Sequence, residues 1–222
     1  MEARYALRKR QLLDECQVSP EIFEHVIPRL DSLMKPVVTI FQGQVGDQHA
    51  KTYVCGRLSN LERNNVASLA YRFDHARLPL QAFMGWEEWD DEPLRLTLRH
   101  QVKTPLGPGD GVLVFDPSGF PQSGRQSVGV ARQWCGRLGT VDNGPVALYV
   151  GYVSSKGHTL VDQRLVLPKA WPTATARLDQ AGVPHAYRAS RTRHQWALEM
   201  LANNGAGWPH GWMSGDDEMG RP

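Results

Sequence analysis

The chain has 222 residues, 41% of them hydrophobic, and a formal net charge of +2 at pH 7. A chain of this length can bury a sizeable core in one or two domains. It has no apolar run of about eighteen residues, and its charged N-terminus lacks the apolar centre of a signal peptide, so we expect neither a membrane protein nor a secreted one. Widely spaced cysteines outside any CxxC pattern favour reduced thiols in a cytoplasmic protein; they are Cys16, Cys55 and Cys135.

The first fifty residues contain short apolar stretches interrupted by proline. Proline in the interior of a helix removes a backbone hydrogen bond and clashes with the preceding turn. This part of the chain therefore predicts one or two short helices, broken at Pro20, Pro28 and Pro36.

Apolar residues keep helical spacing further along, which predicts a helix over 59–70 and a second amphipathic stretch after a break at Pro79. Arg57 and Arg63 would be exposed cations on this region. The segment could belong to a helical DNA-binding domain, but a purely structural helix fits the pattern nearly as well.

A segment rich in proline and glycine, TPLGPGDG, separates helical patterns from strand-like patterns. We therefore expect a helical N-terminal region over residues 1–105, which is a candidate DNA-binding domain. A second domain is expected over residues 106–222.

Short β-branched runs bounded by turn residues indicate strands after this division. The expected strands are 111–115, 127–135, 145–153, 160–167 and 211–214, with turns at GFPQSG and TVDNG. A helix over 193–203 precedes the last strand. Three antiparallel strands, a helix and then a parallel strand make an α/β fold with a mixed sheet.

Asp116 follows the first of these apolar strands, and a basic segment follows Asp116. No acid occurs from residue 117 to residue 140, whereas Arg125, Arg132 and Arg137 do. An acid in such surroundings can attract a metal ion together with a phosphate. Asp116 could equally cap a turn, because aspartate side chains often bond to the backbone of their own turn.

Several long sequence segments of the chain resemble those of one known family. The segments GFPQSGRQSVGVARQWCGRLGTVDN and VALYVGYVSSKGHTLVDQRLVLPKAW resemble the core of DDE-type insertion-sequence transposases, in particular the family written IS-seven-oh-one. The likeness continues upstream through YVCGRLSNLERNNVASLAYRFD and LQAFMGWEEWD, and downstream to WMSGDDEMG. It implies an RNase H-like mixed sheet, incomplete here, preceded by an α-helical N-terminal domain.

The resemblance also implies which residues carry the chemistry. Asp116 matches the first acid of the DDE triad and Asp216 matches the second, and together they would hold Mg²⁺ or Mn²⁺ at the ends of adjacent strands. Nothing in this chain corresponds to the third acid, a glutamate well downstream of the second aspartate, and Pro117 stands where the family commonly has another aspartate. We therefore expect a C-terminally truncated and inactive transposase.

The distribution of charge indicates the partner. Cations dominate the segment from 164 to 193, where they are Arg164, Lys169, Arg177, Arg188, Arg191 and Arg193. With the arginines after Asp116 they predict a surface for double-stranded DNA at transposon ends, in a nucleoid-associated protein that could form a homo-oligomer. A solvated basic surface without a partner is the alternative interpretation.

Two other functions remain open at this point. The chain could be a non-catalytic DNA-binding remnant, or a competitor of the full-length transposase for transposon ends. It could also be a nuclease that uses Asp116 and Asp216 with a nearby acid such as Asp217.

Overall fold

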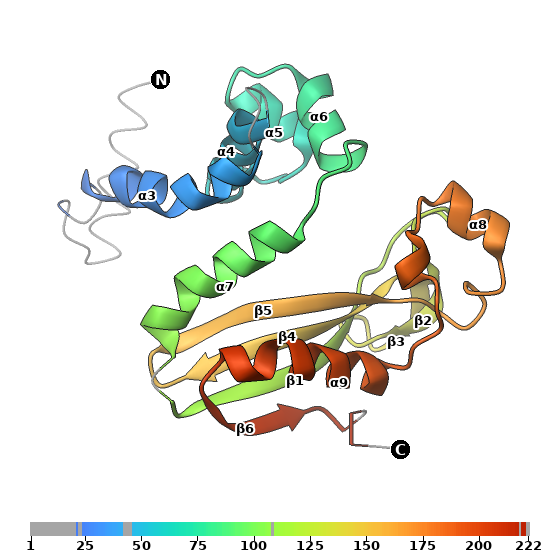
Figure 1. The fold of residues 1–222 in the computed structure, drawn as a ribbon. Coiled ribbons are helices and arrows are strands. Elements are labelled where there is room, and N and C mark those ends of the chain that lie inside the picture. Colours follow the sequence, from blue (N-terminus) through green and yellow to red (C-terminus); the bar gives the residue numbers. More distant parts are fainter. Residues whose placement is uncertain (1–20, 22–23, 42–45, 108, 218, 221–222) are drawn as a thin grey trace. The chain divides into compact units, whose positions relative to one another are not determined.

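The computed structural model describes residues 21, 24–41, 46–107, 109–217 and 219–220. The chain divides into two compact units, Met1–Thr97 and Leu98–Pro222. The first unit is helical and the second contains the β-sheets (Figure 1).

The first unit is built from short helices. They are α3 (Val26–Val38), the 3-10 turn η1 (Thr39–Phe41), α4 (Gly46–Arg57), α5 (Val66–Arg72) and α6 (Arg77–Gly85). Leu69 and Leu80 are fully buried between α4, α5 and α6, and Tyr53 packs against them. Phe83 forms a second small cluster with Phe41 and other aromatic rings.

The predicted helix breaks at proline are wrong for the prolines that the structure describes. Pro28 is the third residue of α3 and Pro79 is the third residue of α6. Both lie in a first helical turn, where the backbone N–H has no partner within the helix and proline costs little. Pro36 lies within the last turn of α3, and Pro20 lies outside the described residues.

The predicted helix over 59–70 is also wrong. Helix α4 ends at Arg57, and the Ser59 hydroxyl donates a hydrogen bond to the Gly56 carbonyl at 2.6 Å, which closes the end of that helix. Helix α5 begins only at Val66, because the Asn65 side chain accepts a hydrogen bond from the Ser68 amide at 2.9 Å and caps the new helix. The apolar residues that suggested one helix therefore belong to the connecting segment after α4 and to α5.

The second unit contains a four-stranded sheet in the order β5-β4-β1-β6 and a separate two-stranded sheet. Its elements after α7 (Glu92–Leu106) are β1 (Gly111–Gly119), β2 (Ala131–Cys135), β3 (Thr140–Gly144), β4 (Val146–Ser154), β5 (Gly157–Val166), α8 (Thr175–Gln180), η2 (His185–Tyr187), α9 (Arg193–Asn204), η3 (Gly205–Gly207) and β6 (His210–Gly215). Strand β4 is antiparallel to both β1 and β5, whereas β6 is parallel to β1. This is the predicted mixed sheet.

Helix α9 covers one face of the four-stranded sheet (Figure 1). Alternate residues of β4 point toward it, and Leu148 and Tyr152 among them are fully buried. Helix α9 contributes Trp196 and Met200 to the same core, and both lie on its inner face. A Cβ atom at position 111 would lie 2.2 Å from the Tyr152 ring, so the start of β1 requires glycine.

The predicted arrangement of the hairpin is wrong. The strand expected over 127–135 is shorter, and the TVDNG segment expected as a turn is strand β3 itself, which pairs with β2 outside the main sheet. The turn lies instead at Gly136–Gly139, where Gly139 has a φ of 63°. Asn143 does not form a turn because its side chain donates to the backbone of the 122–124 loop.

The elements nearest the two aspartates follow the predictions closely. Helix α9 and strand β6 match the expected helix over 193–203 and the parallel strand over 211–214. Strand β1 runs four residues past its predicted end, because Asp116, Pro117, Ser118 and Gly119 continue the antiparallel ladder with β4.

Candidate active site

The parallel pairing of β1 with β6 brings Asp116 and Asp216 to neighbouring positions. The last pair in this ladder is Phe115 with Gly215, and an aspartate follows each of them. Neighbouring strands lie about 4.8 Å apart, so the two backbones are adjacent at this point. Phe115 points into the core under α9, and because successive side chains alternate, Asp116 lies on the opposite face of the sheet.

Both aspartates are exposed and each has a hydrogen bond within its own segment. The Ser118 hydroxyl donates to Asp116 Oδ2 at 3.0 Å. The Met219 amide donates to Asp216 Oδ1, also at 3.0 Å, and so Asp216 closes the turn that follows β6. These two bonds fix one oxygen of each carboxylate, Oδ2 of Asp116 and Oδ1 of Asp216.

A cation lies close to Asp216. Arg193, the first residue of α9, is partly buried, and burial lowers the pKa of its guanidinium while the Asp216 carboxylate acts in the opposite direction. The surroundings of Asp216 are therefore less negative than two adjacent acids alone would make them.

An open groove of about 650 Å³ extends from Asp116 across the face of the sheet that α9 leaves uncovered. Its lining includes Ser118, Tyr149 and His158, the last from β5. Burial raises the pKa of Tyr149, so its hydroxyl stays protonated at neutral pH and can donate a hydrogen bond. The groove thus places an acid, hydroxyl groups and an imidazole along one surface.

Sequence reasoning missed two of these groups. Ser118 lies two residues from Asp116 on the same strand and therefore on the same face, which the period of two in a strand could have indicated. His158 has no such signal, because nothing in the sequence shows that β5 lies across β4 from Asp116.

The predicted DNA-binding arginines fall in separate places. Arg137 lines the groove with Asp116, whereas Arg125 and Arg132 line a second hollow beside the β2–β3 hairpin. Arg57 and Arg63 belong to the first unit, at the end of α4 and in the loop after it. All five side chains belong to exposed residues.

Much of the basic segment over 164–193 is held in ion pairs within the chain. Arg188 pairs with Asp179 at 2.6 Å, and Arg191 pairs with Glu199 while its guanidinium lies over the Trp196 ring. These pairs leave fewer cations for a partner than the sequence suggested.

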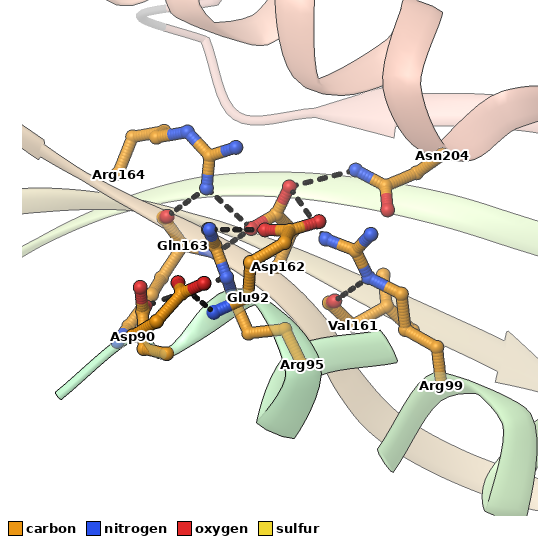
Figure 2. Close-up of polar contacts among 10 residues, drawn as sticks. Asp90, Glu92, Arg95, Arg99, Val161, Asp162, Gln163, Arg164 and Asn204 are labelled. Carbon is orange, nitrogen blue, oxygen red and sulfur yellow. Dashed lines mark hydrogen bonds and ion pairs between the residues drawn. The ribbon is translucent and has the colours of Figure 1, made fainter. Parts of the chain in front are cut away.

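Asp162 on β5 is the centre of the most buried of these ion pairs (Figure 2). Its side chain has no exposed surface and lies 2.6 Å from the Arg164 guanidinium and 3.1 Å from the Arg99 guanidinium of α7. Asn204, at the end of α9, donates a hydrogen bond to it at 2.7 Å. Arg164 thus neutralises a buried acid, which is a structural role.

The two aspartates supply oxygen ligands of the kind that Mg²⁺ and Mn²⁺ prefer. Among the residues that the structure describes, no group of three or more histidine, cysteine, aspartate or glutamate side chains is arranged to hold a metal ion. Asp116 and Asp216 therefore fit a divalent metal ion as two of its ligands, and the ion would need further ligands beside them.

A family model described as DDE superfamily endonuclease matches residues 41–214, well over half of the chain. The chain belongs to this superfamily. Asp116 lies inside the matched region, and Asp216 follows two residues after its end. No curated protein and no solved structure matches the chain.

Membership of the DDE endonucleases confirms the predicted resemblance to DDE-type transposases and the predicted fold class, an RNase H-like mixed sheet preceded by helices. The narrower family written IS-seven-oh-one stays a prediction. Among the described residues, none of the helices is both long enough and apolar enough to cross a membrane.

Proposed function

We propose that this DDE endonuclease is a transposase polypeptide that binds double-stranded DNA at transposon ends and supplies Asp116 and Asp216 as the first two acids of the DNA-cleaving site. The observation that carries the proposal is the parallel register, in which Phe115 pairs with Gly215 and an acid follows each of these two residues. Residues one hundred positions apart are thereby neighbours in space.

Each residue of the site has a distinct part in this proposal. A divalent metal, when bound between the two aspartates, would activate the attacking oxygen or stabilise the leaving oxygen at a phosphate. Ser118 orients Asp116 through its hydrogen bond to Oδ2. Arg137, in the same groove, offers a planar donor for a DNA phosphate next to the acids.

Metal binding tests the assignment of the acids. Titration of the purified chain with Mn²⁺, followed by electron paramagnetic resonance, should show a site whose affinity falls about tenfold or more in Asp116→Asn and in Asp216→Asn. Asp110→Asn is the matched control, because Asp110 is an exposed acid before the other end of β1. Equal affinity in all three variants and in the wild type would reject the proposal.

We further propose that the chain alone does not cut DNA, since two carboxylates that already accept hydrogen bonds hold a metal ion loosely. Correct positioning for in-line attack contributes several kcal/mol of transition-state stabilisation. Incubation with Mg²⁺ or Mn²⁺ and supercoiled plasmid DNA should give nicking no faster than buffer. Nicking that Asp116→Ala abolishes would instead identify a nuclease using the two aspartates, with Asp217 as an additional acid.

A non-catalytic role as a DNA-binding remnant or competitor is the second candidate. It is favoured by arginines beside the β2–β3 hairpin that pair with no acid in the part of the chain that the structure describes. This second candidate would be supported if Asp116→Asn and Asp216→Asn changed neither DNA binding nor Mn²⁺ binding.

A further inference from the structure

The arginines of the second unit are of two kinds. Some are paired with carboxylates; these are Arg99 and Arg164 with Asp162, Arg188 with Asp179, and Arg191 with Glu199. Others have no carboxylate partner among the described residues, and three of them surround one hollow of about 520 Å³; these are Arg125, Arg132 and Arg177. Three arginines without a carboxylate partner among the described residues are thus gathered around one hollow, whereas Arg137 lines the groove beside Asp116.

None of the described residues that line this hollow is acidic. Its walls are the β2–β3 hairpin, the loop before β2, and helix α8, which packs beside the hairpin (Figure 1). Like charges brought together without counter-charges destabilise the folded state through mutual repulsion, so such a cluster is favoured when an anion occupies it.

Arg177 is held in place before any ligand binds. Its guanidinium lies 3.8 Å from the centre of the Trp171 ring, and Nη2 donates to the carbonyl of Arg125 at 2.6 Å and to that of Val130 at 3.2 Å. Trp171 is fully buried and donates to the same Val130 carbonyl at 3.1 Å. A guanidinium fixed in this way loses little conformational entropy when it binds a phosphate.

The loop that carries Arg125 is also fixed. The Asn143 side chain donates to the carbonyl of Gln122 at 2.7 Å and to that of Gly124 at 2.8 Å. Gly124 has a φ of 93°, a backbone angle that residues with a side chain rarely adopt, and it turns the loop immediately before Arg125. Arg132 is an exposed residue of β2 in the same hollow.

We infer that this hollow, defined by Arg125, Arg132 and Arg177, binds successive phosphates of one DNA strand, independently of the Asp116–Asp216 site. The inference rests on the proposed function for the identity of the polyanion. Each DNA strand presents a phosphate about every 3.4 Å along the helix axis, so an open surface with several guanidinium groups suits a run of phosphates. The contacts carry no base recognition, because they involve the backbone of the DNA alone.

The test measures how DNA affinity depends on salt, with a duplex of arbitrary sequence. Each phosphate contact contributes about −0.9 to the slope of log K against log salt, equivalent to a factor of about 3.5 in affinity between 50 and 200 mM salt. Arg125→Ala and Arg132→Ala should each make the slope of log K against log salt less negative by about 0.9. Lys156→Ala removes an exposed cation from the turn between β4 and β5, and it should leave the slope unchanged.

Arg177 needs a different substitution, because its removal uncovers Trp171. Arg177→Lys keeps the charge but loses the planar donors, so it should weaken DNA binding while the thermal unfolding temperature shows that the chain remains folded. Slopes equal to wild type in Arg125→Ala and Arg132→Ala would overturn the inference, whatever Arg177→Lys does.

Two further outcomes separate this inference from the proposed function. Wild-type protein that does not bind the duplex at all contradicts the proposed function as well. Wild-type binding that falls in Arg137→Ala, but not in the variants of the hollow, leaves the proposed function standing and overturns the inference. Inorganic pyrophosphate serves as a small-anion probe of the hollow. If Arg125→Ala and Arg132→Ala abolish pyrophosphate binding but leave the salt dependence of DNA binding unchanged, the hollow binds small anions and the inference is also overturned.

Discussion

Replacing Asp162 should destabilise the second unit more than any surface substitution. Its side chain is completely buried, and the two guanidinium groups beside it are only 14% and 13% exposed. Asp162→Ala leaves both cations without their carboxylate and leaves Asn204 without one acceptor. Breaking a buried pair by removing one partner costs about 3–5 kcal/mol, because an uncompensated charge stays buried.

The loss can be measured by urea unfolding. With an m-value of about 2 kcal/mol per molar, the midpoint should fall by about 1.5–2.5 M. Hydrogen exchange at the β4 amides assigns the loss to the unit that contains Asp162, since β4 lies between β1 and β5. Asp162→Asn keeps the size and one acceptor, so it should fall between wild type and Asp162→Ala.

Asp179→Ala is the matched control. Asp179 also forms an ion pair with an arginine, at 2.6 Å, but its side chain is 64% exposed. A surface pair of this kind contributes about 0–1 kcal/mol. If Asp162→Ala cost no more than Asp179→Ala, burial would not govern the energy of the Asp162 cluster and the reasoning would be refuted.

Two further substitutions test local features of the second unit. Thr192→Ala should cost about 1 kcal/mol in urea unfolding, because Thr192 and Gln195 form a capping box at the start of α9; no loss would mean that the box does not stabilise the helix. Gly144→Ala should cost about 1–3 kcal/mol, since its Cβ would lie 2.1 Å from the Phe120 carbonyl oxygen, whereas Gly136→Ala, with open space around it, should cost much less. Equal losses in the two glycine variants would contradict the close approach at Phe120.

The sheet and the position of the two aspartates could be predicted because they depend on local patterns. Val146–Ser154 is an almost continuous apolar run, and α9 carries its buried Trp196 and Met200 at helical spacing, so both elements are visible in a short window of sequence. The parallel placement of β6 then followed from the order of the elements. It was this order, together with the resemblance, that brought Asp116 beside Asp216.

The remaining features depend on contacts between distant residues. TVDNG has the composition of a turn, but Asn143 uses its amide to hold the loop at Gln122 and Gly124 instead. Arg164 and Arg177 look alike in the sequence, yet one neutralises a buried acid and the other lies on a tryptophan ring. No local pattern distinguishes the two, because their partners are defined only by the folded chain.

The position of Pro117 has a consequence for how the site could be altered. Strand β1 pairs with strands on both sides up to Phe115, and after that residue it pairs with β4 alone. Proline cannot donate to a new neighbour, so Pro117 discourages any lengthening of the parallel ladder beyond the two acids. A designer who placed an aspartate at this position would gain a carboxylate but would also remove the residue that keeps Asp116 and Asp216 just beyond the end of the parallel ladder.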